Sequence, residues 1–115
     1  MARVDLELLN LIGAETINLR ATRVTQGVRW VIRPPETIVG SIRHHCQAEV
    51  PDPSRLDLEY VVAGTPDVIL TFEYTLDDGC GSTSYDSTSS DYRVDSTCSA
   101  SGRSRFRLCV AFRRR

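Results

Sequence analysis

Residues 27 to 40 read GVRWVIRPPETIVG, and this stretch contains the only tryptophan and the only Pro-Pro pair of the chain. Apolar side chains occupy every second position at Val28, Trp30 and Ile32, which is the spacing of a strand with one buried face. Trp30 is therefore predicted to point into the core. The Pro34-Pro35 pair ends the strand, because proline has no amide hydrogen to donate to a sheet and restricts the residue before it.

The same scheme of short strand, turn and short strand recurs along the whole chain. A run at 36–39 connects the tryptophan strand to the next alternation, and 99–102 is predicted to be a turn. The polar stretch 77–90 is predicted to be a long loop, with a short irregular strand inside it as the alternative. No window has helical periodicity. The predicted strands cover about residues 3–8, 16–21, 28–33, 41–50, 56–62, 68–76, the segment from 92, and 104–113.

This strand list predicts an all-β protein, with a single-domain antiparallel β-sandwich of about eight strands over residues 1–115. The length suffices for one core but not for two. The alternation assigns the inward positions to Leu6, Leu19, Trp30, Cys46, Leu58, Tyr60, Leu70, Phe72, Phe106, Leu108 and Val110.

Charge is balanced overall but unevenly distributed. The formal net charge is −1 and all 14 basic residues are arginine, so the composition gives no general reason to bind nucleic acid. Residues 57–95 contain nine carboxylates and one arginine, whereas residues 103–115 contain six arginines and no acid. We expect an acidic surface and a basic last strand.

The N-terminus resembles no cleavable signal peptide, because Asp5 and Glu7 interrupt any apolar segment. No run approaches the ~20 apolar residues of a membrane span. We therefore expect a protein that is cytoplasmic or secreted without a cleavable signal.

No motif in the sequence supports catalysis, metal binding or cofactor binding. The four cysteines lack the C-x-x-C spacing of a structural zinc site and allow three disulfide pairings, with Cys80–Cys98 the first candidate if the protein is oxidised. His44 and Cys46 share a strand face, which formally allows a metal site or a Cys–His nucleophile, but that face is predicted to be core. Carboxylates around the 77–90 stretch leave calcium as a further alternative. The sequence predicts a non-enzymatic protein without a cofactor.

Several segments together resemble the aegerolysin and actinoporin-like family of sandwich proteins. They are Asn10-Leu11-Ile12-Gly13, Ile17-Asn18-Leu19, Gly27-Val28-Arg29-Trp30 followed by Pro35, Ile38 and Gly40, the hairpin strands Leu58-Glu59-Tyr60 and Val68 to Tyr74, and the small-residue stretch Gly79 to Asp86. The resemblance implies a β-sandwich that recognises membrane lipids. It implies lipid binding or partner-assisted lysis rather than autonomous pore formation, because a strand begins by residue 3 and leaves no amphipathic helix before it.

The leading hypothesis is recognition of a membrane-lipid or glycan headgroup, peripheral to the membrane. Tyrosines beside small polar residues suit such ligands, since a phenol offers an apolar face and a hydroxyl together. On the resemblance, the headgroup site comprises Tyr85, Asp86 and Tyr92, with Trp30 as a framework aromatic. The alternative is an assembly protein that self-associates or binds a protein partner through Arg103, Arg105 and Arg107, docked on an acidic surface of its neighbour.

Overall fold

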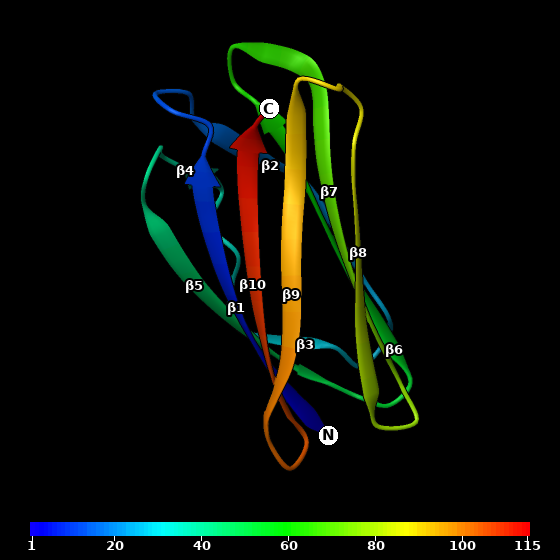
Figure 1. Cartoon of the computed structure of the whole chain (residues 1–115). Coiled ribbons are helices and arrows are strands. Elements are labelled where there is room, and N and C mark those ends of the chain that lie inside the picture. The colour runs from blue at the N-terminus through cyan, green and yellow to red at the C-terminus, as the bar shows by residue number, and fades with distance from the viewer.

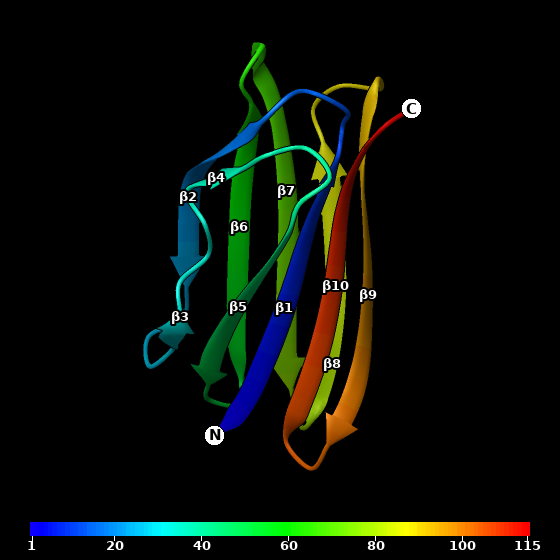
Figure 2. The ribbon, with the colours of Figure 1, turned by 90° about the vertical axis from the view of Figure 1, so that its left-hand side faces the viewer.

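The computed structural model describes residues 1–115 as ten strands in two stacked sheets (Figures 1 and 2). One sheet has the order β3-β5-β1-β10-β9 and is called sheet A; the other has the order β4-β2-β6-β7-β8 and is called sheet B. The strands are β1 (Ala2–Leu11), β2 (Ile17–Val24), β3 (Arg29–Ile32), β4 (Thr37–Ile38), β5 (Arg43–Val50), β6 (Ser54–Val62), β7 (Thr65–Asp77), β8 (Cys80–Ser87), β9 (Tyr92–Gly102) and β10 (Arg105–Arg114).

The predicted sandwich is confirmed, but its sheets are not purely antiparallel. The first and last strands, β1 and β10, lie side by side in parallel at the centre of sheet A, with Leu6 opposite Leu108. All other strand pairs are antiparallel. From β1 to β6 each strand lies in the other sheet from the strand before it. The first and last strands are neighbours in space although they are far apart in the sequence. No helix in the fold is long and apolar enough to cross a bilayer.

The structure has ten strands rather than eight because two predicted connections are themselves strands. The short run after the Pro-Pro pair contains β4, which pairs with the start of β2. The predicted 77–90 loop contains β8, which pairs with β7 along its whole length. Asp78 and Gly79 both have positive φ, 49° and 74°, as the central residues of a two-residue type I′ hairpin turn require.

The predicted turn at 99–102 is also displaced. β9 continues to Gly102, and the reversal occurs at Arg103 and Ser104, before β10 begins. Ser104 adopts a φ of 54° there. The polar and small residues at 99–102 form the end of an edge strand instead of the loop that their composition suggests.

The core lies between the sheets and follows the predicted alternation closely. Nine of the eleven predicted inward residues are buried. Leu19 and Trp30 are only partly buried and pack against the margin of the core. Leu19 precedes a register irregularity in β2, and Trp30 lies on β3, a four-residue edge strand covered on one side only.

Candidate functional site

A pocket lies at the margin of the sandwich where β8 of sheet B faces β9 of sheet A. The hydroxyl of Ser96 donates a hydrogen bond to Thr83 Oγ1 at 3.1 Å and links the two edge strands. Nearer the β8–β9 connection the edge opens into a pocket of about 320 Å³, which we call the seam pocket. Its lining comprises Tyr85, Asp86, Ser87, Ser89, Ser90, Tyr92, Arg93, Val94 and Arg115.

Three of the four residues predicted for the headgroup site therefore line one pocket. Tyr85 is 54% exposed and Asp86 is exposed beside it. Tyr85 lies opposite the buried Phe72 of β7, on the inner face of sheet B, but β8 is the last strand of that sheet. The phenol consequently lies at the open margin, where a ligand can reach it, instead of inside the core.

Tyr92 is buried, although it borders the polar segment of the chain. Tyr92 is 4% exposed, because it is in phase with Val94 on the inner face of β9. Its hydroxyl donates to Glu15 Oε2 at 3.3 Å, and the Arg114 guanidinium carbon lies 5.6 Å from its ring centroid. Tyr92 thus anchors the β1–β2 loop and the C-terminal strand, and its ring contributes to the wall of the seam pocket.

The backbone around the seam pocket is held by hydrogen bonds of its own. Asp86 Oδ1 accepts the Ser87 amide at 2.8 Å, and Ser87 Oγ donates to the Ser89 carbonyl at 2.8 Å. The Arg115 amide donates to the Asp91 carbonyl at 2.8 Å, which keeps the end of the chain beside the loop. A site whose walls are already ordered binds with a smaller entropic cost.

Trp30 does not belong to this site. It lies on β3, at the opposite edge of sheet A from β9, and Figure 2 separates β3 clearly from β8 and β9. The pairing of Trp30 with Ala48 is followed by a register shift between Trp30 and Ile32. Its half-buried ring covers the core at that edge, so the structure does not bring Trp30 together with Tyr85, Asp86 and Tyr92.

Three of the nine carboxylates of the predicted acidic surface are paired with arginines of sheet B. On the outer face of sheet B, Arg55 pairs with Asp57 at 3.2 Å and with Glu73 at 2.8 Å. Arg23 forms an ion pair with Glu59. These carboxylates are therefore less available to the arginines of a neighbouring molecule than the sequence indicates.

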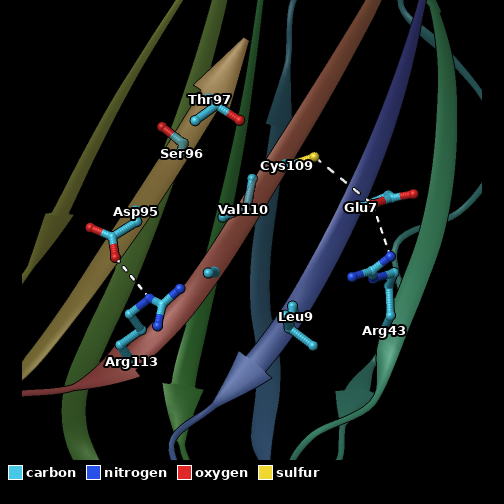
Figure 3. A pocket seen from close by; sticks show the side chains of 10 residues that line it. Glu7, Leu9, Arg43, Asp95, Ser96, Thr97, Cys109, Val110 and Arg113 are labelled. Carbon is cyan, nitrogen blue, oxygen red and sulfur yellow. Dashed lines mark hydrogen bonds and ion pairs between the residues drawn. The ribbon is translucent and has the colours of Figure 1, made fainter.

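A second hollow, which the sequence did not indicate, lies on the outer face of sheet A (Figure 3). It has a volume of about 270 Å³ and forms where the small side chains of Cys109 and Ala111 lie between longer charged ones. Glu7 lies 3.7 Å from Arg43 on one flank, and Asp95 lies 3.0 Å from Arg113 on the other. The small residues at alternate positions of the last strand are the signal that could have revealed it.

The charged groups of this hollow are already paired with one another, which leaves the Cys109 thiol as its distinctive chemical group. The thiol donates a long hydrogen bond to Glu7 Oε2 at 3.9 Å. No group of three or more histidine, cysteine or acidic side chains is arranged to hold a metal ion anywhere in the structure.

The cysteines differ sharply in accessibility. All four are free thiols, so the candidate Cys80–Cys98 bridge is not formed; Cys80 and Cys109 are exposed, whereas Cys46 is buried. Burial, with the charge of Asp5 adding to it, raises the pKa of Cys46 to about 12, which opposes a role as a nucleophile. We expect dithionitrobenzoate to label Cys80 and Cys109 first and Cys46 only after unfolding.

This labelling order can be checked by titration with mass spectrometry. Cys109→Ser should remove one fast site and leave the slow phase unchanged. Rapid modification of Cys46 in the folded protein would contradict the buried position of its strand face.

No family model matches the chain, and no curated protein matches it in sequence. Among solved structures, the fold is similar to that of the RahU protein, determined as a crystal structure in complex with a TRIS molecule. The TM-score is 0.72 at 8% sequence identity, and the match covers 99% of this chain and 96% of RahU. The likeness extends over the full sandwich and shows a shared fold.

Proposed function

We propose that the protein is a non-enzymatic binding protein that recognises a membrane-lipid or glycan headgroup at the seam pocket. The observation that carries the proposal is the exposed ring of Tyr85 beside a carboxylate, guanidinium groups and serine residues around one pocket. The resemblance to aegerolysins supports the same reading. On that resemblance, binding would be peripheral to the membrane and would contribute to lysis only with a partner.

The chemistry of the pocket suits a headgroup that is polar but has an apolar face. The Tyr85 ring can lie against the C–H face of a sugar or against a quaternary ammonium group, and its hydroxyl can exchange hydrogen bonds with ligand oxygens. Asp86 supplies a negative charge for an amine or hydroxyl. Arg115 supplies a positive charge for a phosphate.

The RahU comparison suggests a practical probe. TRIS, which that protein binds in its crystal, is a small amine with three hydroxyl groups and so shares chemistry with polar headgroups. We propose TRIS as a competitor in the assays below, which therefore need a buffer without it.

Tyr85→Ala is expected to weaken binding to headgroup-bearing liposomes at least about tenfold, because removal of an aromatic anchor at a binding site costs ~2 kcal/mol. The side chain is exposed, so thermal stability should change little. Tyr85→Phe should retain most of the affinity if the ring face dominates. Co-sedimentation with liposomes, combined with circular dichroism melting curves, measures both effects.

Ile42→Ala is the matched control, since Ile42 is 45% exposed and lies beside β5, outside the seam pocket. The Ile42→Ala substitution should leave liposome binding unchanged. Equal binding by Tyr85→Ala and the original protein would rule out the seam pocket as the headgroup site.

A further inference from the structure

One end of the outer face of sheet A collects arginines from two strands and a turn. The parallel register of β1 and β10 sets Arg3 directly opposite Arg105, and Asp5 opposite Arg107. Arg103 occupies the turn that precedes β10. In Figure 1 this end, with the N-terminus and the β9–β10 turn, lies opposite the β8–β9 connection beside the seam pocket.

The carboxylates at this end are already engaged. Glu49 is shared between Arg3 at 3.4 Å and Arg29 at 2.8 Å. Asp5 lies 3.1 Å from His45 and accepts a hydrogen bond from Gln47 at 2.6 Å. Partial burial opposes the charged form of Asp5, but the hydrogen bonds from Gln47 and His45 outweigh it and lower its pKa.

Three arginines remain without such a partner. Arg103, Arg105 and Arg107 are all exposed, and none of them belongs to the ion pairs within 4.0 Å that five other arginines of sheet A form with Glu49, Glu7 or Asp95. A cavity of about 340 Å³ opens among Arg3, Arg103 and Arg105, with Glu49, Ser104 and the first two residues completing its lining. The cavity is thus surrounded by more positive charge than negative.

Arg3 faces Glu49 of β5 on one side and Arg105 of β10 on the other. Glu49 is shared with Arg29, so it offsets the charge of Arg3 only in part, and the like charges of Arg3 and Arg105 repel across the parallel pair. An anion between the two guanidinium groups would reverse the sign of the interaction. Arginine is well suited to this role, because its planar fork binds phosphate and sulfate oxygens in pairs.

We propose that the cavity between Arg3, Arg103 and Arg105 is a binding site for an oxyanion, the phosphate or sulfate group of a soluble or membrane-borne ligand. Arg107, one step along the same face of β10, extends the site toward a second anionic group. The molecule is 39 Å long, and this site lies at the end away from the seam pocket, so it is independent of the proposed headgroup site.

The test uses pyrophosphate as the probe, at constant ionic strength set with sodium chloride. Pyrophosphate should raise the melting temperature beyond the effect of chloride, and titration calorimetry should detect binding. Arg105→Gln should weaken pyrophosphate binding at least tenfold. Without pyrophosphate, the same variant should melt at an unchanged or higher temperature, because the facing like charges are removed.

Arg20→Gln is the matched control, since it removes one exposed arginine from β2 of the other sheet. Vesicles with and without phosphatidic acid form a second arm. Binding to them that depends on Arg105 but not on Tyr85 identifies a membrane-borne source of the phosphate, and binding to free pyrophosphate alone identifies a soluble one.

Three results would overturn the proposal. The first is a melting temperature that pyrophosphate raises no more than chloride does. The second is equal pyrophosphate affinity in Arg105→Gln and Arg20→Gln. The third is self-association at low salt that Arg105→Gln abolishes, which would assign these arginines to a protein interface. None of them bears on the seam pocket, whose test depends on Tyr85.

Discussion

Replacing Asn10 by alanine is expected to lower the free energy of unfolding by about 4 kcal/mol, since several buried polar groups lose their partners together. Asn10 is fully buried near the end of β1. Its amide donates to the carbonyls of Glu15 and Ile38 at 2.8 and 2.9 Å, and its side-chain oxygen accepts the Ile12 amide at 2.9 Å. Alanine removes all three bonds and leaves the backbone groups without replacements.

Urea unfolding followed by circular dichroism measures this loss. Asn18→Ala is the control, because the Asn18 side chain accepts only one exposed hydrogen bond, from Thr37 at 3.0 Å. Asn18→Ala should lower the free energy of unfolding by less than about 1 kcal/mol. Equal destabilisation by the two variants would contradict the structural role of Asn10.

Gly40→Ala is expected to destabilise the fold by about 3 kcal/mol, at the upper end of overpacking effects, because the space for a methyl group is occupied by backbone. A Cβ atom at Gly40 would lie 1.9 Å from the Gly13 carbonyl oxygen. Removing this clash requires the β1–β2 loop to move. A hydrogen bond between the neighbouring backbone segments opposes that movement, since the Ser41 amide donates to the Asn10 carbonyl at 2.7 Å.

Gly64→Ala provides the comparison for this effect in the same urea experiment. Its Cβ would meet only the carboxylate end of Glu15, at 3.2 Å, and that flexible side chain can move aside. We expect a change below about 1 kcal/mol. A Gly40→Ala protein as stable as Gly64→Ala would contradict the close approach of the two loops.

Asn10 and Gly40 connect the stability of the fold to the proposed site. Asn10 holds the Glu15 carbonyl, and the Glu15 carboxylate accepts the hydroxyl of Tyr92, part of the wall of the seam pocket. Asn10 and Gly40 therefore fix the loop against which one wall of the pocket is anchored.

Local sequence patterns predict the parts of this fold that depend on local contacts. The hairpin of β6 and β7 has clean alternation on both strands, and Leu58 lies opposite Phe72 in the structure. The last strand likewise has Phe106, Leu108, Val110 and Phe112 on its buried face. In both cases a two-residue period and one apolar face leave a single consistent orientation.

The strands that the sequence misses lack such a face. β8 has the sequence CGSTSYDS, and as an edge strand it buries little apolar surface, so composition indicates a loop. The Asp78-Gly79 turn was the available signal for the hairpin. The parallel pairing of β1 with β10 has no local signal at all, because it joins the two ends of the chain.

The same distinction applies to the candidate site. Tyr85, Asp86 and Tyr92 line one pocket, but the burial of Tyr92 could not be inferred locally, because its hydrogen bond to Glu15 spans 77 positions in the sequence. Trp30 was placed in the core by its alternation, but the position of β3 at a sheet edge leaves it half-buried. The topology determines which strand lies at the edge of a sheet. The two-residue period of a strand does not indicate whether it is an edge strand.

The most direct test of the central claim is co-sedimentation of the purified protein with liposomes of varied headgroup composition, at low and high salt and without TRIS. We expect binding that depends on one headgroup, persists at high salt and falls at least about tenfold in Tyr85→Ala. Absence of sedimentation with every headgroup, or binding that high salt abolishes and Tyr85→Ala leaves intact, would contradict headgroup recognition at the seam pocket.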